Sequence, residues 1–171
     1  MQHGLVWAYL TLLGFLACYG VYRYHLLAMY YRVRSRRPTA AHAVEPWPRV
    51  TIQIPVYNER YVIERAVQSA CEVDYPQDRL EVQILDDSTD ETSELAKQAI
   101  ERYRQQGIAI HHVQRASRKD FKAGALAEAL KSATGEYIAV FDADFIIPKD
   151  FLRRTIPFFT DTSVGMVQVR W

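Results

Sequence analysis

The sequence YIAVFDADF, residues 137–145, decides the fold of this chain. It is a run of apolar and aromatic residues, long enough for a strand buried on both faces of a sheet, and it contains two acids one residue apart near its end. Ligands gather at the carboxyl ends of strands in an open parallel sheet, and the two-residue period of a strand turns Asp142 and Asp144 toward the same side. Two such carboxylates suit a hard divalent cation that also binds a diphosphate; the competing interpretation is a polar turn.

Strands and amphipathic helices alternate along the rest of the chain. Strands are predicted at residues 50–54, closed by Pro55, and at residues 80–85, 108–113, 137–141 and 164–169. Helices are predicted after Asn58 as an N-cap, after a capping box of Ser88 and Glu91 with an end at Gly107, at residues 122–133, and from Pro148 onward. A polar, basic and mobile loop is predicted at residues 115–121. This alternation predicts a three-layer, Rossmann-like α/β fold with a mainly parallel sheet and right-handed crossovers.

Polar clusters follow three of the predicted strands, so one edge of the sheet collects them. The clusters are Tyr57, Asn58 and Glu59 after the first strand, Asp86 and Asp87 after the second, and Asp142 and Asp144 after the fourth. A metal held by the last pair would neutralise a nucleoside diphosphate, and Lys122, at the start of a helix, would add a positive charge. Asp86 or Asp87 would accept hydrogen bonds from the nucleoside, and Tyr57 would pack on its base.

These side chains also have structural interpretations. Tyr57 then covers its loop, Glu59 stabilises a helix N-terminus, and Lys122 is simply solvated. His111 and His112 lie in a predicted strand without a metal-ligand partner at useful spacing, so we interpret them as structural. The sequence contains no cysteine or histidine zinc pattern, no nucleophilic triad and no P-loop.

An uncharged segment near the N-terminus has the length that a helix needs to cross a bilayer. It is residues 4–22, GLVWAYLTLLGFLACYGVY. No lysine or arginine precedes it and five arginines follow within residues 23–37, which favours a membrane-spanning helix over a cleaved signal peptide. The positive-inside rule places the arginines and everything after them in the cytoplasm, at an inner, plasma or Golgi-type membrane. Residues 1–37 are thus the membrane segment, 38–48 a short linker and 49–171 the soluble domain.

The net charge of +1 hides an asymmetry. Five of the 21 lysines and arginines lie in residues 23–37, so the remainder, with all 20 aspartates and glutamates, is mildly acidic. Such a balance excludes the basic footprint of a nucleic-acid-binding domain. Cys18, in the predicted span, and Cys71, on a predicted helix, are too far apart to pair, which agrees with a reducing cytoplasm.

Six motifs, in this order and spacing, resemble the family 2 glycosyltransferases with the glycosyltransferase A fold. They are IPVYNER, VQILDDSTDET, FKAGALAEAL, YIAVFDADF, FLRRTIPFF and MVQVRW, within residues 48–171. Within that family they look most like the motifs of membrane-bound cellulose synthases and cellulose-synthase-like mannan and glucan synthases. Linked motifs of this kind are far more specific than one isolated D-x-D.

The resemblance implies a donor site and a reaction. It implies that Pro55, Tyr57 and Glu59 border the nucleotide sugar, that Asp86 or Asp87 contacts the base and ribose, that Lys122 lies near the diphosphate, and that Asp142 and Asp144 hold Mg²⁺ or Mn²⁺, with Asp142 also at the donor. Such enzymes invert the anomeric centre: a general base deprotonates an acceptor hydroxyl, which attacks the hexose of UDP-glucose or GDP-mannose and expels the nucleoside diphosphate. The implied product is a growing β-linked polysaccharide, and the implied partners are the donor, the acceptor, membrane lipid and no nucleic acid.

Two motifs of that family are absent from the chain. The family's general base is an acid in a later T/E-E-D-like motif, and a still later Q-x-x-R-W motif binds the acceptor. Residues 168–171, QVRW, have one residue too few between Gln and Arg, and they fall where the family has the strand after the metal site. We therefore expect an N-terminal fragment that holds the donor-binding half and lacks the base.

Three other functions compete with polysaccharide synthesis. A single transfer to a lipid acceptor would use the same donor site, because processivity depends on later segments. A fragment without its base would bind a nucleotide and catalyse nothing. A phosphohydrolase with an aspartate nucleophile would place D-x-D after the first strand and Thr or Val two residues after the second acid, where this sequence has Ile146.

Overall fold

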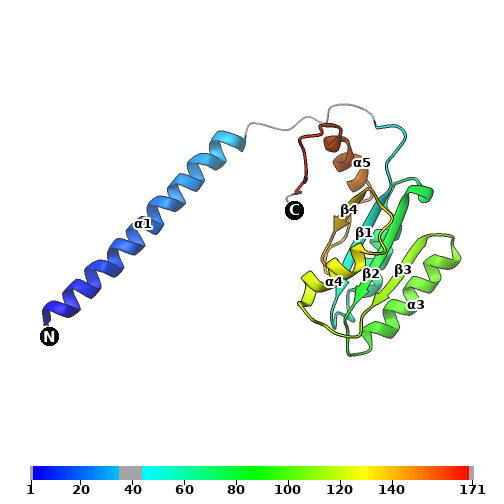
Figure 1. The fold of residues 1–171 in the computed structure, drawn as a ribbon, viewed down its shortest axis with the longest axis horizontal. Helices are drawn as coiled ribbons and strands as arrows, with labels where there is room; N and C mark the ends of the chain where they lie inside the picture. The colour runs from blue at the N-terminus through cyan, green and yellow to red at the C-terminus, as the bar shows by residue number, and fades with distance from the viewer. Residues whose placement is uncertain (1, 35–43, 170–171) are drawn as a thin grey trace. The chain divides into compact units, whose positions relative to one another are not determined.

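A computed structural model describes residues 2–34 and 44–169 of the chain. These residues form two separate units, an N-terminal helix and an α/β domain (Figure 1). Each unit has its own physical logic.

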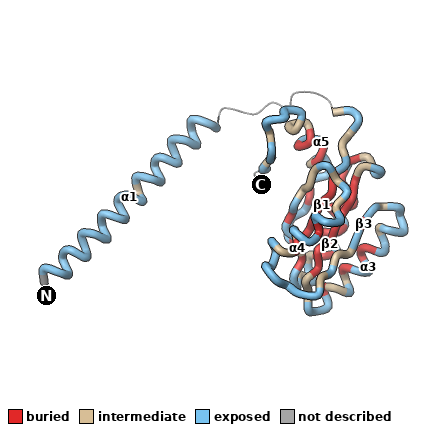
Figure 2. Tube along the Cα trace, in the orientation of Figure 1, coloured by how far each residue is buried: buried red, intermediate tan, exposed pale blue. Residues whose placement is uncertain are grey.

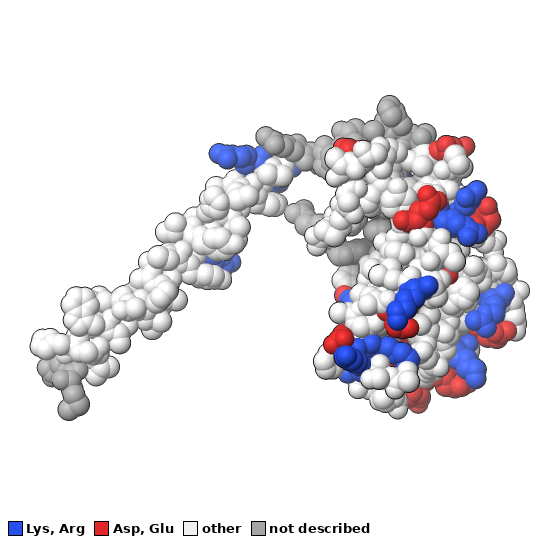
Figure 3. All heavy atoms as spheres, viewed as in Figure 1, with Lys and Arg blue, Asp and Glu red and all other residues white. Residues whose placement is uncertain are grey.

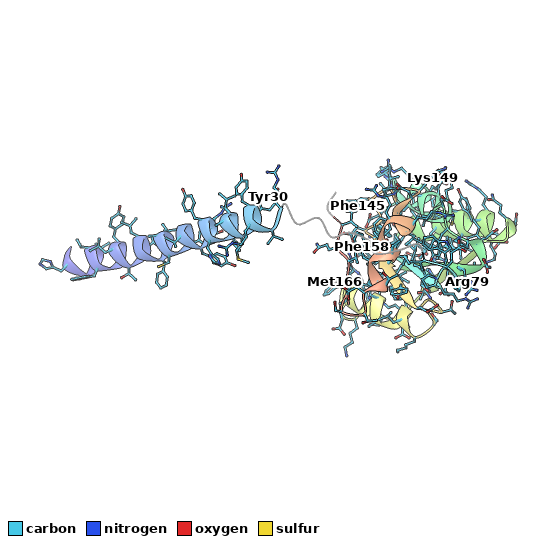
Figure 4. All side chains as sticks on the ribbon, turned by 90° about the horizontal axis from the view of Figure 1, so that it is seen from above. Tyr30, Arg79, Phe145, Lys149, Phe158 and Met166 are labelled. Atoms are coloured by element: carbon cyan, nitrogen blue, oxygen red, sulfur yellow. The ribbon has the colours of Figure 1, made fainter. Side chains whose placement is uncertain are left out.

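The helix α1 (Gln2–Arg34) is long and apolar enough to cross a membrane. Its residues are almost all exposed (Figure 2), and its side chains, Tyr30 among them, radiate in every direction (Figure 4). Lysine and arginine appear only in its C-terminal half (Figure 3). The helix continues past residue 22, where the predicted span ended, because residues 21–34 contain neither proline nor glycine. We therefore describe α1 as a candidate transmembrane helix.

The α/β domain is built on one parallel sheet in the order β3-β2-β1-β4. The strands are β1 (Val50–Val56), β2 (Leu80–Asp86), β3 (Ala109–Gln114) and β4 (Tyr137–Val140). The helices are α2 (Ile63–Cys71), α3 (Thr92–Gln105), α4 (Phe121–Leu130) and α5 (Phe151–Thr155), with short 3-10 segments η1 (Gln77–Arg79) and η2 (Ile156–Thr160). Val56 pairs with Asp86 and Asp86 with Gln114, so these strands end together at one edge. The predicted parallel α/β fold is confirmed.

Helices cover both faces of the sheet, and the main core lies on only one of them. The helices α2 and α3 pack against each other, with α2 against β1 and β2 and α3 against β3, while α4 packs on β1 and β2 (Figure 1). The α2 and α3 side holds the fully buried Ile52, Ile54, Val82 and Ile84. The α4 side has a smaller apolar cluster of Leu85, Ala125 and Ala129.

Beside that small cluster, the α4 face of the sheet buries a polar layer. Glu81 Oε2 accepts hydrogen bonds from Thr51 Oγ1 at 2.5 Å, from the Thr134 backbone N–H at 2.8 Å and from Thr134 Oγ1 at 3.0 Å. Gln53 Nε2 donates to Gln83 Oε1 at 2.9 Å. The alternating polar residues of β1 and β2 are therefore interior residues, satisfied by one another and by the segment after α4.

The strand β4 is shorter and more exposed than the sequence predicted. It ends at Val140, and none of its four residues is fully buried. The predicted strand at residues 164–169 does not form among the described residues. Residues 166–169 instead line an open apolar pocket of about 640 Å³ with β4, α5 and η2. Within the described part of the chain, β4 therefore pairs only with β1, and the prediction of a strand buried on both faces was wrong.

Both predicted helix N-caps are wrong. Asn58 adopts a left-handed conformation, with φ of 55°, and its Oδ1 accepts a hydrogen bond from the Thr89 backbone N–H at 2.9 Å. The Asn58 N–H donates to Ser88 Oγ at 3.0 Å. These side chains join the loops after β1 and β2, because the two strands end side by side. The helices begin later, at Ile63 and Thr92, without side-chain caps.

Several observed boundaries of strands and helices also differ from the predicted ones. The strand β1 runs through Pro55 to Val56, and the helix predicted from Pro148 is split into α5 and η2, where Pro157 cannot donate a backbone hydrogen bond. Of the predicted linker, residues 38–43 lie outside the described residues. Trp47 packs against the core, with its ring centroid 5.4 Å from that of Tyr75. The domain limits otherwise stay a prediction.

Candidate functional site

The predicted functional residues lie at the carboxyl-terminal edge of the sheet. Tyr57 and Glu59 follow β1. Asp86 is the last residue of β2, and Asp87 follows it. Lys122 lies in the first turn of α4, and Asp142 and Asp144 follow β4. Pro55 is partly buried within β1. The parallel register explains this convergence, because strands that start together and run the same way deliver their following loops to one edge.

Three of these residues form an acidic group. Burial raises the pKa of the Glu59 carboxyl, and the negative charges of Asp144 and Asp142 raise it further, against a lowering effect of Lys122. Asp142 and Asp144 are both exposed. The accumulated negative charge favours a cation at this position.

The ammonium group of Lys122 already pairs with one of these acids. Its Nζ donates to Asp142 Oδ1, and the two side chains are 49% and 52% exposed. Such an accessible pair is held weakly, so a phosphate or a metal ion can separate it. Within residues 2–34 and 44–169, no three His, Cys, Asp or Glu side chains are placed to hold a metal by themselves. A metal at Asp142 and Asp144 would take its other oxygens from water or a phosphate.

Asp86 is enclosed by hydrogen-bond donors, and its side chain is 0% exposed. The Ser88 N–H donates to Oδ1 at 2.9 Å, while Oδ2 lies 2.9 Å from His112 Nε2 and accepts from Gln114 Nε2 at 3.3 Å and from the Ser93 hydroxyl. Burial by itself raises the pKa of the Asp86 carboxyl, but these hydrogen bonds outweigh it and hold the pKa far below its usual range. Asp86 thus fastens β2 to β3 and α3, and a nucleoside would reach it only after rearrangement.

Asp87 forms a salt bridge with Arg115, a residue that the sequence did not identify as part of the site. Arg115 donates from Nε to Oδ1 at 2.7 Å and from Nη2 to Oδ2 at 2.5 Å. The same guanidinium donates to the carbonyl oxygens of Lys119 and Phe121, both at 2.6 Å. It thereby links Asp87 to the basic loop before α4; the predicted mobility of that loop stays a prediction. Gly124 makes room for it, because a Cβ there would lie 2.5 Å from Arg115 Nη1.

The same loop covers the aromatic ring of the site. The Arg118 guanidinium carbon lies 3.3 Å from the centroid of the Tyr57 ring and 5.1 Å from that of Phe121. Tyr57 remains 38% exposed. A cation over an exposed ring contributes about 0.5–1 kcal/mol. The ring is therefore accessible to a flat ligand once Arg118 moves.

Sequence reasoning brought the correct loops together but not all of the residues that act there. In a parallel sheet, residues that follow the strands gather at one edge, which we call the strand-end rule. Arg115 follows β3 as Tyr57 follows β1, so this rule could have identified Arg115. Phe121 is close to Arg118 in the sequence, but nothing local indicates the contact of Arg118 with the distant Tyr57. His112 was interpreted as structural, and its contact with Asp86 fits that interpretation.

Comparisons with known sequences agree with the geometry. Residues 51–171 match the family described as Glycosyl transferase family 2. Glucomannan 4-beta-mannosyltransferase 1 of Oryza sativa subsp. japonica is 41% identical over 157 residues, and glucomannan 4-beta-mannosyltransferase 7 of Arabidopsis thaliana is 42% identical over 130 residues. These alignments cover 82% and 73% of this chain but only 30% and 23% of the relatives. The chain thus spans less than a third of the length of either relative.

Two solved structures share the fold. The mannosyltransferase PcManGT from Pyrobaculum calidifontis, solved with GDP-Man and Mn²⁺, has a TM-score of 0.67 and 34% identity, covering 81% of this chain and 41% of its own. S. aureus TarS 1–349, solved in complex with UDP-GlcNAc, has a TM-score of 0.58 and 25% identity, covering 72% of this chain and 37% of its own.

Proposed function

Because the chain belongs to glycosyltransferase family 2, we propose that its α/β domain binds the nucleotide-sugar donor of an inverting enzyme that builds a β-linked polysaccharide. One observation carries the proposal: Lys122, in the first turn of α4, meets Asp142 beside Asp144 and Glu59. A helix N-terminus with a lysine favours an anion, and the acids next to it favour a cation. A diphosphate with its divalent metal needs both at adjacent positions.

The donor set fits a hard divalent cation, and we assign Mg²⁺ or Mn²⁺ to Asp142 and Asp144. When bound, the metal would offset the negative charge that the leaving diphosphate develops. Lys122 would exchange Asp142 for a phosphate oxygen, and Glu59, whose pKa is raised, would border the sugar-phosphate. The proton of the acceptor hydroxyl passes to a general base that we assign to none of these residues.

We take GDP-mannose as the first candidate donor and UDP-glucose as the second. The relatives named above are named for mannosyl transfer, and PcManGT was solved with GDP-Man. The acceptor in this proposal is the polysaccharide chain. We also propose that the uncharged N-terminal part of α1 spans the membrane and that the domain is cytoplasmic, which the arginines in the C-terminal half of α1 favour by the positive-inside rule.

The direct test is metal-dependent binding of GDP and UDP by the full chain in detergent. Replacing both Asp142→Ala and Asp144→Ala is expected to weaken binding in Mn²⁺ by about tenfold or more, down to the metal-free affinity of the wild type, because the cation loses its protein ligands. Calorimetric titration with and without Mn²⁺ measures this. The matched control is Asp150→Ala, another exposed acid of the same region. Unchanged Mn²⁺-dependent binding in the double variant would refute the assignment.

A further inference from the structure

Arg118 is a cation of the site that forms no ion pair within the described part of the chain. Two nearby cations are already paired, Arg115 with Asp87 and Lys122 with Asp142. The contacts of the Arg118 side chain are instead aromatic, with its guanidinium over Tyr57 and near Phe121. Its charge is therefore available to an anionic ligand.

The backbone that follows Arg118 is held by hydrogen bonds. Arg115 holds the carbonyl oxygens of Lys119 and Phe121, and the Phe121 N–H donates to the Arg118 carbonyl at 3.1 Å. Rotation of the side chain alone can uncover the Tyr57 ring, without moving the loop or its link to Asp87.

We propose that Arg118 is a donor-binding residue that changes partners: it stacks on Tyr57 in the free protein, yields that ring to the nucleobase, and then pairs with the diphosphate. This inference rests on the proposed function and adds a residue and an exchange to it. A nucleobase stacks on an aromatic side chain more strongly than an exposed guanidinium does, so the base can take the ring. The displaced guanidinium presents planar donors that match phosphate oxygens, as a lysine does not.

The exchange predicts opposite effects on two probes. In the full chain in detergent with Mn²⁺, Arg118→Ala is expected to bind the nucleoside guanosine about twofold more tightly than the wild type, because nothing competes for Tyr57. The same variant is expected to bind GDP about tenfold more weakly, because the diphosphate loses a cation. The ratio of GDP to guanosine affinity thus falls about twentyfold, whereas Arg118→Lys is expected to restore it only in part. Calorimetric titration of both probes gives the ratio.

A neighbouring lysine supplies the control. Lys119→Ala removes the same charge from the same loop but has no aromatic contact among the described residues, and its ratio is expected to match that of the wild type. Equal weakening of GDP and guanosine by Arg118→Ala would make Arg118 a structural support and overturn the proposal, as would an unchanged ratio. If the wild type binds neither GDP nor UDP in Mn²⁺, the proposed function fails; if it binds GDP and the Arg118→Ala variant leaves the ratio unchanged, only the role of Arg118 fails.

Discussion

Replacing Glu81 by alanine is expected to lower the free energy of unfolding by about 2–4 kcal/mol at pH 7, because one buried and two partly buried donors lose their acceptor at roughly 1–3 kcal/mol each and water recovers much of that cost at the exposed Thr134. The donors are Thr51 Oγ1 and the N–H and hydroxyl of Thr134. Thr51 Oγ1 in turn accepts from the Gly135 N–H at 2.9 Å, so the loss of hydrogen bonds would also affect the segment just before β4. Urea unfolding of the full chain in detergent, followed by aromatic fluorescence, measures the change.

The same network makes part of the stability depend on pH. Burial raises the pKa of Glu81, but the hydrogen bonds from Thr134 and Thr51 outweigh it and leave the pKa lowered from 4.5. A lowered folded-state pKa means that the stabilisation is fully present above pH 4.5 and is lost as the pH falls through the folded-state pKa. The difference between wild type and Glu81→Gln should therefore shrink below pH 4.5. Glu94→Ala, an exposed acid on α3, is the control, and an equal loss in both alanine variants would contradict the prediction.

The strand-end rule explains why so much of the site could be predicted from the sequence. Apolar runs that end in acids identify strands, and parallel strands bring their ends to one edge whatever the details of packing. The sequence alone therefore places Asp86 and Asp142 at one edge. Their surroundings could not be predicted, because the partners of Asp86 come from β3 and α3 and no local pattern records them.

The predictions that were wrong depend on contacts with a distant segment of the chain, which a local sequence pattern does not record. Asn58 and Ser88 have the local chemistry of helix caps, yet the Asn58 N–H donates to Ser88 Oγ and Asn58 Oδ1 accepts from the Thr89 N–H, so both residues join the two loops instead. β4 was expected to be buried on both faces because its residues are apolar, but residues 164–169 form no strand beside it in the described structure. The apolar composition of a strand indicates that its burial is favourable, but it does not determine whether another segment packs against it.

Substituting alanine for Gly124 is expected to weaken GDP binding in Mn²⁺ by about 30-fold, equivalent to roughly 2 kcal/mol, while leaving the melting temperature nearly unchanged. An added Cβ would overlap the Lys119 carbonyl oxygen and lie 2.5 Å from Arg115 Nη1, so the loop would have to move off the start of α4. Arg115 would lose its carbonyl partners, and Lys122 would lose its place beside Asp142. Calorimetry and thermal unfolding of the same sample measure both quantities.

The expected split between binding and stability follows from the position of Gly124 inside a helix. Alanine is normally better than glycine there by about 1 kcal/mol, which offsets part of the strain in the loop. The apolar contacts of α4 run through Ala125 and Ala129, whereas the atoms nearest the added methyl group belong to Lys119, Arg115 and Asp120 of the preceding loop. Gly165→Ala, with no atom within 4 Å of the new Cβ, is the matched control and should bind as the wild type does. If Gly124→Ala bound GDP normally, the loop held by Arg115 would not shape the donor site; if it bound weakly only because it unfolded, the melting temperature would fall with the affinity.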